Sequence, residues 1–122
     1  IEWNKRYMNL LGVLPKNDME GCLQDVHWSE GMFGYFPSYL IGHLISAQLT
    51  NSLEKKLGKI EILVESKKFN TILHWLRENV HHYGRSLDSE ELVKKVSGTT
   101  LTANYFLEYL ENKIEKVSTI CK

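Results

Sequence analysis

The chain has 122 residues, of which 43% are hydrophobic, and its fifteen basic side chains balance fifteen acidic ones. A chain of this length forms one domain that buries about two-thirds of the surface exposed by its unfolded form. The formal net charge is zero, so the chain has no excess of positive charge that would indicate binding to nucleic acid or to an anionic membrane surface. The longest apolar runs are too short to span a bilayer. We therefore expect a soluble, cytoplasmic protein with neither nucleic-acid nor membrane partners, in which Cys22 and Cys121 are reduced thiols.

Residues 1–11 repeat apolar side chains at spacings of three and four, and Gly12 and Pro15 follow them. This pattern predicts the end of an amphipathic helix. The pattern begins at Ile1, with no methionine and no preceding cap. We therefore expect the chain to be a piece of a longer parent protein.

The segment from Gly12 to Pro37 contains four of the eight glycines and both prolines. Such a composition predicts a long irregular loop, and long loops in compact domains are usually functional or disordered. Its many apolar side chains argue against disorder, so we expect an ordered functional loop. Trp28, Phe33 and Phe36 are expected to form core beneath this loop rather than a platform for a ligand.

Downstream of the loop, the patterns indicate one helix after another and an all-α fold. Pro37 suits the first position of a long helix, and residues 60–64 favour a helical turn over a buried strand. The remaining signals are Asn70 as the N-cap of a helix ending at Gly84, Asp88 and Glu91 as a capping box before Gly98, and Thr102 as the cap of a last helix reaching Ile120.

The loop leads directly into the N-terminus of the longest predicted helix. The first turn after Pro37 leaves backbone N–H groups without partners in the helix, and the helix dipole adds partial positive charge there. We expect this end to favour an anionic group such as a carboxylate.

Asp25 and His27 are candidates for acid-base chemistry within the loop. If residues 24–28 are extended, the two side chains project to the same side, so that the carboxylate orients the imidazole and favours its protonated form. His27 would then act as a hydrogen-bond donor or proton carrier. The alternative is a structural histidine that is hydrogen bonded to the backbone.

Tyr35 and Tyr39 flank Pro37, beside the predicted helix N-terminus. A phenol in this position can donate a hydrogen bond to a developing oxyanion. An ordinary buried ring with a satisfied hydroxyl is an equally good interpretation of either tyrosine.

No metal site is predicted within this chain. His74, Glu78 and His82 share one helix face, but three ligands over two turns of a helix diverge too far to bind one ion, so we interpret them as a solvated face. The sequence contains no His-Glu-x-x-His helix, nucleophile elbow, phosphate loop or dinucleotide fingerprint. Nucleophilic catalysis and nucleotide binding are therefore without support.

Two runs of residues carry a family resemblance. The run from Gly21 to Trp28 has the pattern Gly-x-x-Gln-Asp-x-His-Trp, and the run from Gly34 to Tyr39 reads Gly-Tyr-Phe-Pro-Ser-Tyr. Together they closely resemble the C-terminal region of the carboxypeptidase Taq family, the thermostable zinc carboxypeptidases. Ser38 stands where threonine is usual. The resemblance extends along the chain through Trp3, Asn4, Tyr7, Trp75, Leu76, Arg77, Tyr105 and Phe106.

This resemblance implies a zinc-dependent enzyme that removes one residue from the C-terminus of a peptide. In the family, a His-Glu-x-x-His helix and a further glutamate hold the zinc, and an upstream arginine grips the terminal carboxylate; this chain contains neither motif. The resemblance implies that His27, Tyr35 and Tyr39 stabilise the oxyanion or the substrate carboxylate. It also implies that Gln24, Asp25 and Trp28 line or support that site.

On this basis, residues 1–122 are expected to be the C-terminal helical fragment of a metallocarboxypeptidase catalytic domain, inactive on its own. Its partners would be the upstream catalytic part of the same chain, the peptide substrate, and a second subunit in a homodimer. Two other functional classes stay open for this chain. One is a non-catalytic helical module that binds a partner protein, and the other is a structural subdomain with no site.

Overall fold

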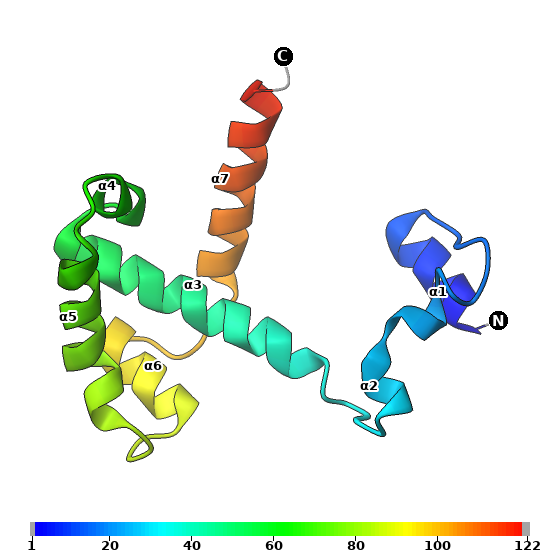
Figure 1. The fold of residues 1–122 in the computed structure, drawn as a ribbon, viewed down its shortest axis with the longest axis horizontal. Helices are drawn as coiled ribbons and strands as arrows, with labels where there is room; N and C mark the ends of the chain where they lie inside the picture. Colours follow the sequence, from blue (N-terminus) through cyan, green and yellow to red (C-terminus); the bar gives the residue numbers. More distant parts are fainter. Residues whose placement is uncertain (1, 121–122) are drawn as a thin grey trace. The chain divides into compact units, whose positions relative to one another are not determined.

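The computed structural model describes residues 2–120, and these residues form helices and connecting segments without a β-strand (Figure 1). The predicted all-α class is therefore confirmed. The elements are α1 (Glu2–Leu11), the 3-10 turn η1 (Cys22–Gln24), α2 (Val26–Ser29), α3 (Pro37–Leu57), α4 (Ile60–Glu65), α5 (Phe69–Asn79), the 3-10 turn η2 (His81–Tyr83), α6 (Ser89–Ser97) and α7 (Asn104–Ile120). Ile1 and Cys121, on which two of the predictions fall, lie outside the described residues.

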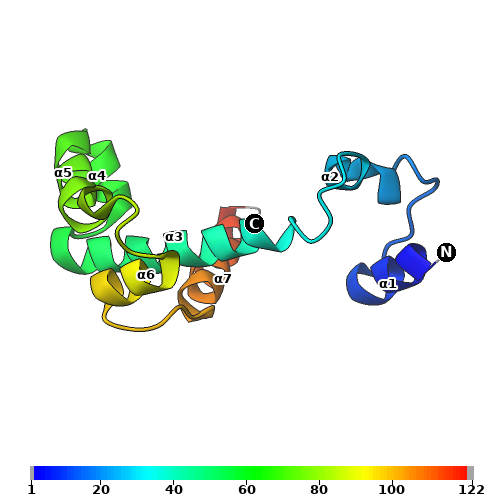
Figure 2. The same cartoon turned by 90° about the horizontal axis from the view of Figure 1, so that it is seen from below.

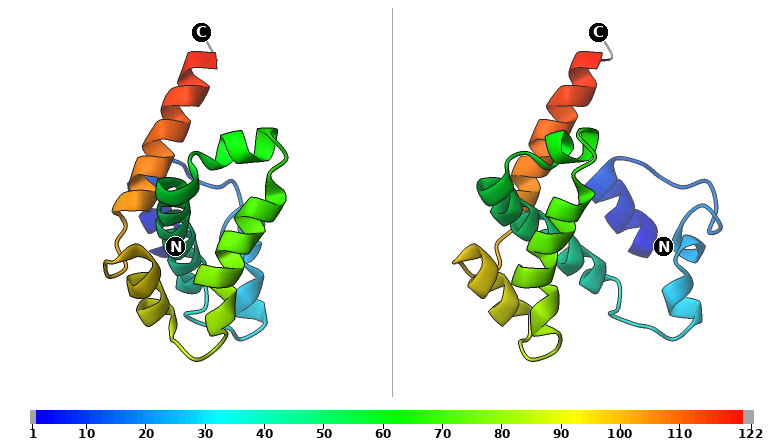
Figure 3. Two further views of the ribbon diagram at one scale, coloured as in Figure 1. Left: turned by 90° about the vertical axis from the view of Figure 1, so that its left-hand side faces the viewer. Right: turned by 60° about the vertical axis from the view of Figure 1, so that its left-hand side comes forward.

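The chain divides into two compact units, residues 1–38 and residues 39–122. In the first unit, Trp3 and Tyr7 stack on α1 with ring centroids 4.4 Å apart. The loop after α1 turns back toward it (Figure 3), and a Cβ atom on Gly21 would lie 3.2 Å from the Trp3 ring and 3.1 Å from Pro15. Gly21 is therefore needed for a close approach of the loop to α1.

The second unit is built around α3. Figures 1 and 2 both show α4 and α5 at the C-terminal end of α3, with α7 starting near its middle. Leu53 of α3, Leu63 of α4 and Trp75 of α5 form the buried cluster that joins these helices. Partly buried side chains that pack against the cluster are Leu57, Ile72, Leu76, Val80 and Val96.

A fully buried glutamine fixes the segment between α6 and α7 to the middle of α3. The Nε2 atom of Gln48 donates to Ser97 Oγ at 2.8 Å and to the carbonyl of Thr100 at 3.1 Å, and its Oε1 atom accepts from the Thr102 N–H at 3.1 Å. Both ends of the amide are therefore satisfied, which is the condition for burying it.

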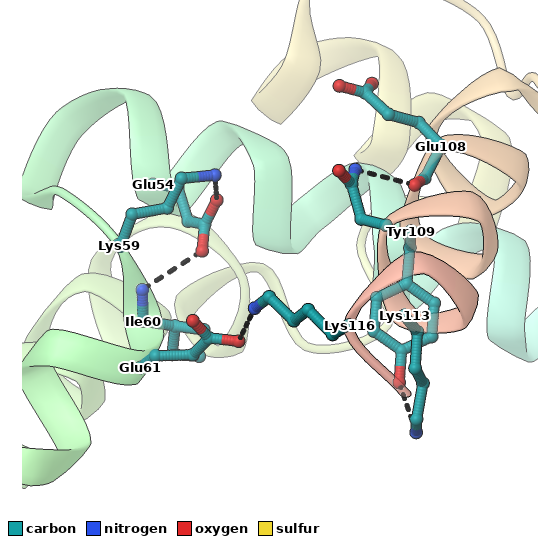
Figure 4. A network of polar contacts seen from close by, with 9 residues as sticks. Glu54, Lys59, Ile60, Glu61, Glu108, Tyr109, Lys113 and Lys116 are labelled. Atoms are coloured by element: carbon teal, nitrogen blue, oxygen red, sulfur yellow. Dashed lines mark hydrogen bonds and ion pairs between the residues drawn. The ribbon is translucent and has the colours of Figure 1, made fainter. Parts of the chain in front are cut away.

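Figure 4 shows the polar contacts that link α3, α4 and α7. Glu54 of α3 accepts from Lys59 Nζ at 2.9 Å and from the Ile60 N–H at 3.0 Å, so it caps the start of α4. Partial burial acts to raise the pKa of Glu54, but these two hydrogen bonds and the Lys59 charge outweigh it and lower the pKa overall. Lys116 of α7 reaches Glu61 of α4 at 2.8 Å.

Most of the predicted helix boundaries are confirmed. Pro37 opens α3, and residues 60–64 are helical within α4. Asp88 and Glu91 form the predicted capping box, and Gly98 ends α6 in the left-handed conformation with φ 80°. Thr102 Oγ1 accepts from the Asn104 N–H at 3.3 Å at the start of α7.

Two predicted features of the α5 region are wrong. Asn70 is not the N-cap, because α5 already begins at Phe69 and the cap position, Lys68, makes no side-chain bond. The helix also ends before Gly84. Val80 leaves the helical conformation at φ −126°, and the chain then tightens into the 3-10 turn η2, which Gly84 closes with φ 53°.

Candidate active site

The predicted irregular loop contains two short helical segments, η1 and α2. Its first part is held by local hydrogen bonds, including those from the N–H groups of Gly21 and Leu23 to the Asp18 carbonyl at 3.1 and 2.9 Å. The side chain of Gln24 donates to the carbonyl of Met19. Gln24 therefore stabilises the loop that precedes α2.

Asp25 begins α2 and holds the His27 side chain. Its Oδ1 atom accepts from the His27 backbone N–H at 2.8 Å and lies 2.5 Å from His27 Nδ1. The expected extended segment over residues 24–28 is wrong, because N-capping by Asp25 starts a helix at Val26. The expected pairing of carboxylate and imidazole is nevertheless present, since the cap geometry also brings the two side chains together.

The pair is largely shielded from solvent. The side chains of His27 and Asp25 are 17% and 24% exposed. The hydrogen bond from the His27 backbone N–H, followed by the bond from its ring, lowers the pKa of Asp25, against a smaller opposing effect of burial. The carboxylate is therefore the stable form of Asp25 at neutral pH.

Tyr35 lies against His27, with ring centroids 5.6 Å apart and an interplanar angle of 27°. The chain returns to His27 through a tight turn in which the Met32 N–H donates to the His27 carbonyl at 2.8 Å. Gly31 and Gly34 adopt φ 72° and 75° around this turn, a conformation that other residues rarely adopt. The first unit thus brings Asp25, His27 and Tyr35 together.

Tyr39, the third candidate, belongs to the second unit and lies half-exposed in the first turn of α3. At the start of this helix, the Tyr35 carbonyl accepts a hydrogen bond from the Ser38 N–H at 3.0 Å and a second one from the Ser38 hydroxyl. Ser38 therefore ties Tyr35 to the start of α3, and a threonine hydroxyl would be able to make the same bond.

The expectation that Trp28, Phe33 and Phe36 form a core beneath the loop is wrong. Their exposed fractions are 42%, 78% and 65%. The short helices of the first unit cover little surface, and Gly21 is the only buried residue among residues 2–38. Apolar side chains of this loop therefore face outward from the unit.

Among residues 2–120, no group of three or more His, Cys, Asp or Glu side chains is arranged to hold a metal ion. On α5, the exposed side chains of His74 and Glu78 approach each other, with Nε2 and Oε1 3.2 Å apart. Cys22 is a free thiol. Within the same described range, no helix combines the length and the apolar character that crossing a bilayer would require.

The chain matches a known protein family over most of its length. Residues 1–114 match the family described as Carboxypeptidase Taq (M32) metallopeptidase. The chain is 41% identical over 111 residues to carboxypeptidase 1 of Bacillus subtilis and equally identical to thermostable carboxypeptidase 1 of Pyrococcus furiosus. In each case the match covers 91% of this chain and 22% of the relative, so the chain spans about a fifth of the curated relatives it matches.

Solved structures agree with the sequence comparison. The chain is similar to the M32 carboxypeptidase of Deinococcus radiodurans, with a TM-score of 0.83 and 38% identity over 91% of this chain and 22% of that one. Metallocarboxypeptidase 1 of Trypanosoma cruzi gives the same TM-score and identity over 90% of this chain and 23% of that one. The family match spans both runs that carry the resemblance, residues 21–28 and 34–39. The chain belongs to the carboxypeptidase Taq (M32) metallopeptidase family.

Proposed function

We propose that this chain is the C-terminal helical part, residues 1–122, of a zinc-dependent metallocarboxypeptidase that releases C-terminal amino acids from peptides. The family match over residues 1–114 is the observation that carries this proposal. It is supported by relatives that are named carboxypeptidases and that are about five times as long as the matched segment. The chain would supply the substrate-side wall of the active site.

In this proposal, His27, Tyr35 and Tyr39 donate hydrogen bonds to the developing oxyanion or to the terminal carboxylate of the peptide. Asp25 and Gln24 support His27 and its loop through the contacts described above. Trp28, which is 42% exposed on α2, offers an apolar surface to the substrate. A donor aimed at an oxyanion stabilises the transition state by about 3 to 4 kcal/mol, so these residues matter without contacting a metal.

The described residues do not provide a set of zinc ligands. In this proposal, the upstream part of the parent chain holds the zinc, and residues 1–122 alone are inactive. Zinc would supply Lewis-acid activation of the peptide carbonyl and of water. The proposed enzyme is cytoplasmic and homodimeric.

The test uses the full-length protein and two peptides that differ only at the C-terminus. A peptide with a blocked N-terminus and a free C-terminal carboxylate should lose one residue at a time, and the same peptide with a C-terminal amide should be resistant. A chelator should abolish the release, and added Zn²⁺ should restore it, because the proposed chemistry depends on the metal. Release that is unaffected by the chelator, or internal cleavage of both peptides, would contradict the proposal.

A non-catalytic module that binds a partner protein is the second candidate function. The exposure of Phe33 and Phe36, at 78% and 65%, favours it. Such a module would release no amino acid from the free-carboxylate peptide, and its binding would survive replacement of His27 by alanine.

A further inference from the structure

We infer that Asp25 is a positioning residue that holds His27 as the Nδ1–H tautomer, so that Nε2 is the ring atom that meets the substrate. This inference rests on the proposed function for its catalytic meaning. The tautomer itself follows from the geometry of the first unit and is measurable without any assay of activity.

The proton on Nδ1 follows from the partner that faces it. An ionised carboxylate can only accept hydrogen bonds, and Asp25 Oδ1 lies 2.5 Å from His27 Nδ1. Nδ1 must therefore be the donor. The hydrogen bonds that Asp25 accepts from His27 hold its pKa below the ordinary value, so the carboxylate stays ionised at neutral pH.

The orientation of the ring is coupled to the helix cap. The same oxygen, Oδ1, accepts from the His27 backbone N–H at 2.8 Å. Rotating the carboxylate away from the ring would therefore also break the cap of α2. Tyr35 covers the ring from one side, with its centroid 5.6 Å away. Asp25 at the Nδ1 edge and Tyr35 at one face therefore both oppose rotation of the imidazole.

The tautomer decides what His27 is able to do in each protonation state. In the neutral Nδ1–H ring, Nε2 carries a lone pair and accepts a hydrogen bond or a proton. In the imidazolium, Nε2–H is a donor, and it can pass its proton to an anionic oxygen, so that the N–H bond breaks as an O–H bond forms. The ring then returns to the neutral Nδ1–H form. The donor role proposed above therefore belongs to the doubly protonated ring.

The test is nitrogen NMR of the full-length protein labelled in its histidines, with the His27 signals identified by their loss in H27A. At a pH where His27 is neutral, we expect Nδ1 to carry the proton. Asp25→Ser keeps a short oxygen that can cap α2 but removes the ionised acceptor that fixes the proton on Nδ1, so its His27 should change to the Nε2–H tautomer favoured in water. We also expect kcat to fall by about 10- to 100-fold in this variant, with a smaller change in KM.

Asp88→Ser is the matched control, because it makes the same change at the N-cap of α6. It should leave the His27 signals and kcat unchanged. Asp25→Asn should keep the tautomer, since its amide oxygen can still accept from Nδ1–H. Two results would overturn the inference: an Nε2–H tautomer in the unmodified protein, or an Nδ1–H tautomer that persists in Asp25→Ser. If the unmodified full-length protein showed the Nδ1–H tautomer of His27 but cleaved no peptide, that result would count against the proposed function alone.

Discussion

Replacing His27 by alanine in the full-length protein is expected to lower kcat for peptide hydrolysis by about 10²- to 10³-fold, because one hydrogen-bond donor to the oxyanion is lost. KM should change far less, since a bond to the oxyanion strengthens only as negative charge develops, whereas loss of a bond to the terminal carboxylate would raise KM. The bound metal and the helical content should stay the same, because His27 is not a metal ligand in this account. Steady-state kinetics, metal analysis and circular dichroism measure the three quantities.

His74→Ala is the matched control for this experiment. His74 lies on α5 in the second unit, its side chain is 73% exposed and 3.2 Å from Glu78, and it is not one of the candidate site residues. Its removal should leave kcat and KM unchanged. Equal turnover in the His27→Ala and unmodified proteins would remove His27 from the mechanism.

Replacing Gln48 by leucine is expected to lower the free energy of unfolding substantially. The leucine cannot replace the bonds to Ser97, Thr100 and Thr102, and a polar group that loses its partner costs about 1 to 3 kcal/mol where it is fully buried. These partners are themselves partly exposed, so that water can recover some of the loss. We expect the free energy of unfolding to fall by about 3 kcal/mol in total, as measured by urea denaturation.

Gln24→Leu makes the same chemical change at an exposed side chain and should cost less than about 1 kcal/mol, because exposed groups regain bonds to water. Comparing the two variants isolates the effect of burial. If Gln48→Leu were as stable as Gln24→Leu, the hydrogen bonds of Gln48 would not be what fixes the α6–α7 segment to α3.

The helices of the second unit were largely predictable because their signals are local. Pro37 at the start of α3 and the Asp88–Glu91 capping box act within one helical turn, so that short stretches of sequence contain them completely. The end of α5 was not predictable in this way. Val80 leaves the helical conformation four residues before Gly84, which the residue pattern alone marks as the stop.

The role of Gln48 could not be read from the sequence, since its partners Ser97, Thr100 and Thr102 lie about fifty residues away. A glutamine within an apolar helix pattern gives no sign of which distant groups it binds. The exposure of Phe33 and Phe36 was missed for a related reason. Their apolar character favours burial, but it does not indicate whether residues of the same unit bury them.

The candidate site was predictable in its members more than in its geometry. Asp25 and His27 were expected to meet, and they do, although through an N-cap and not through an extended strand. The stacking of Tyr35 on His27 depends on the turn that Gly31 and Gly34 allow, and a sequence pattern does not specify where such a turn leads. The separate roles proposed for Tyr35 and Tyr39 are still predictions.

A crystal structure of the full-length protein with a tetrahedral, non-hydrolysable peptide analogue would test the proposed role of His27 most directly. We expect His27 Nε2 to lie about 3 Å from an oxygen of the tetrahedral group, with Asp25 still bound to Nδ1. A His27 ring enclosed by aliphatic side chains, with no path to the bound analogue, would contradict it.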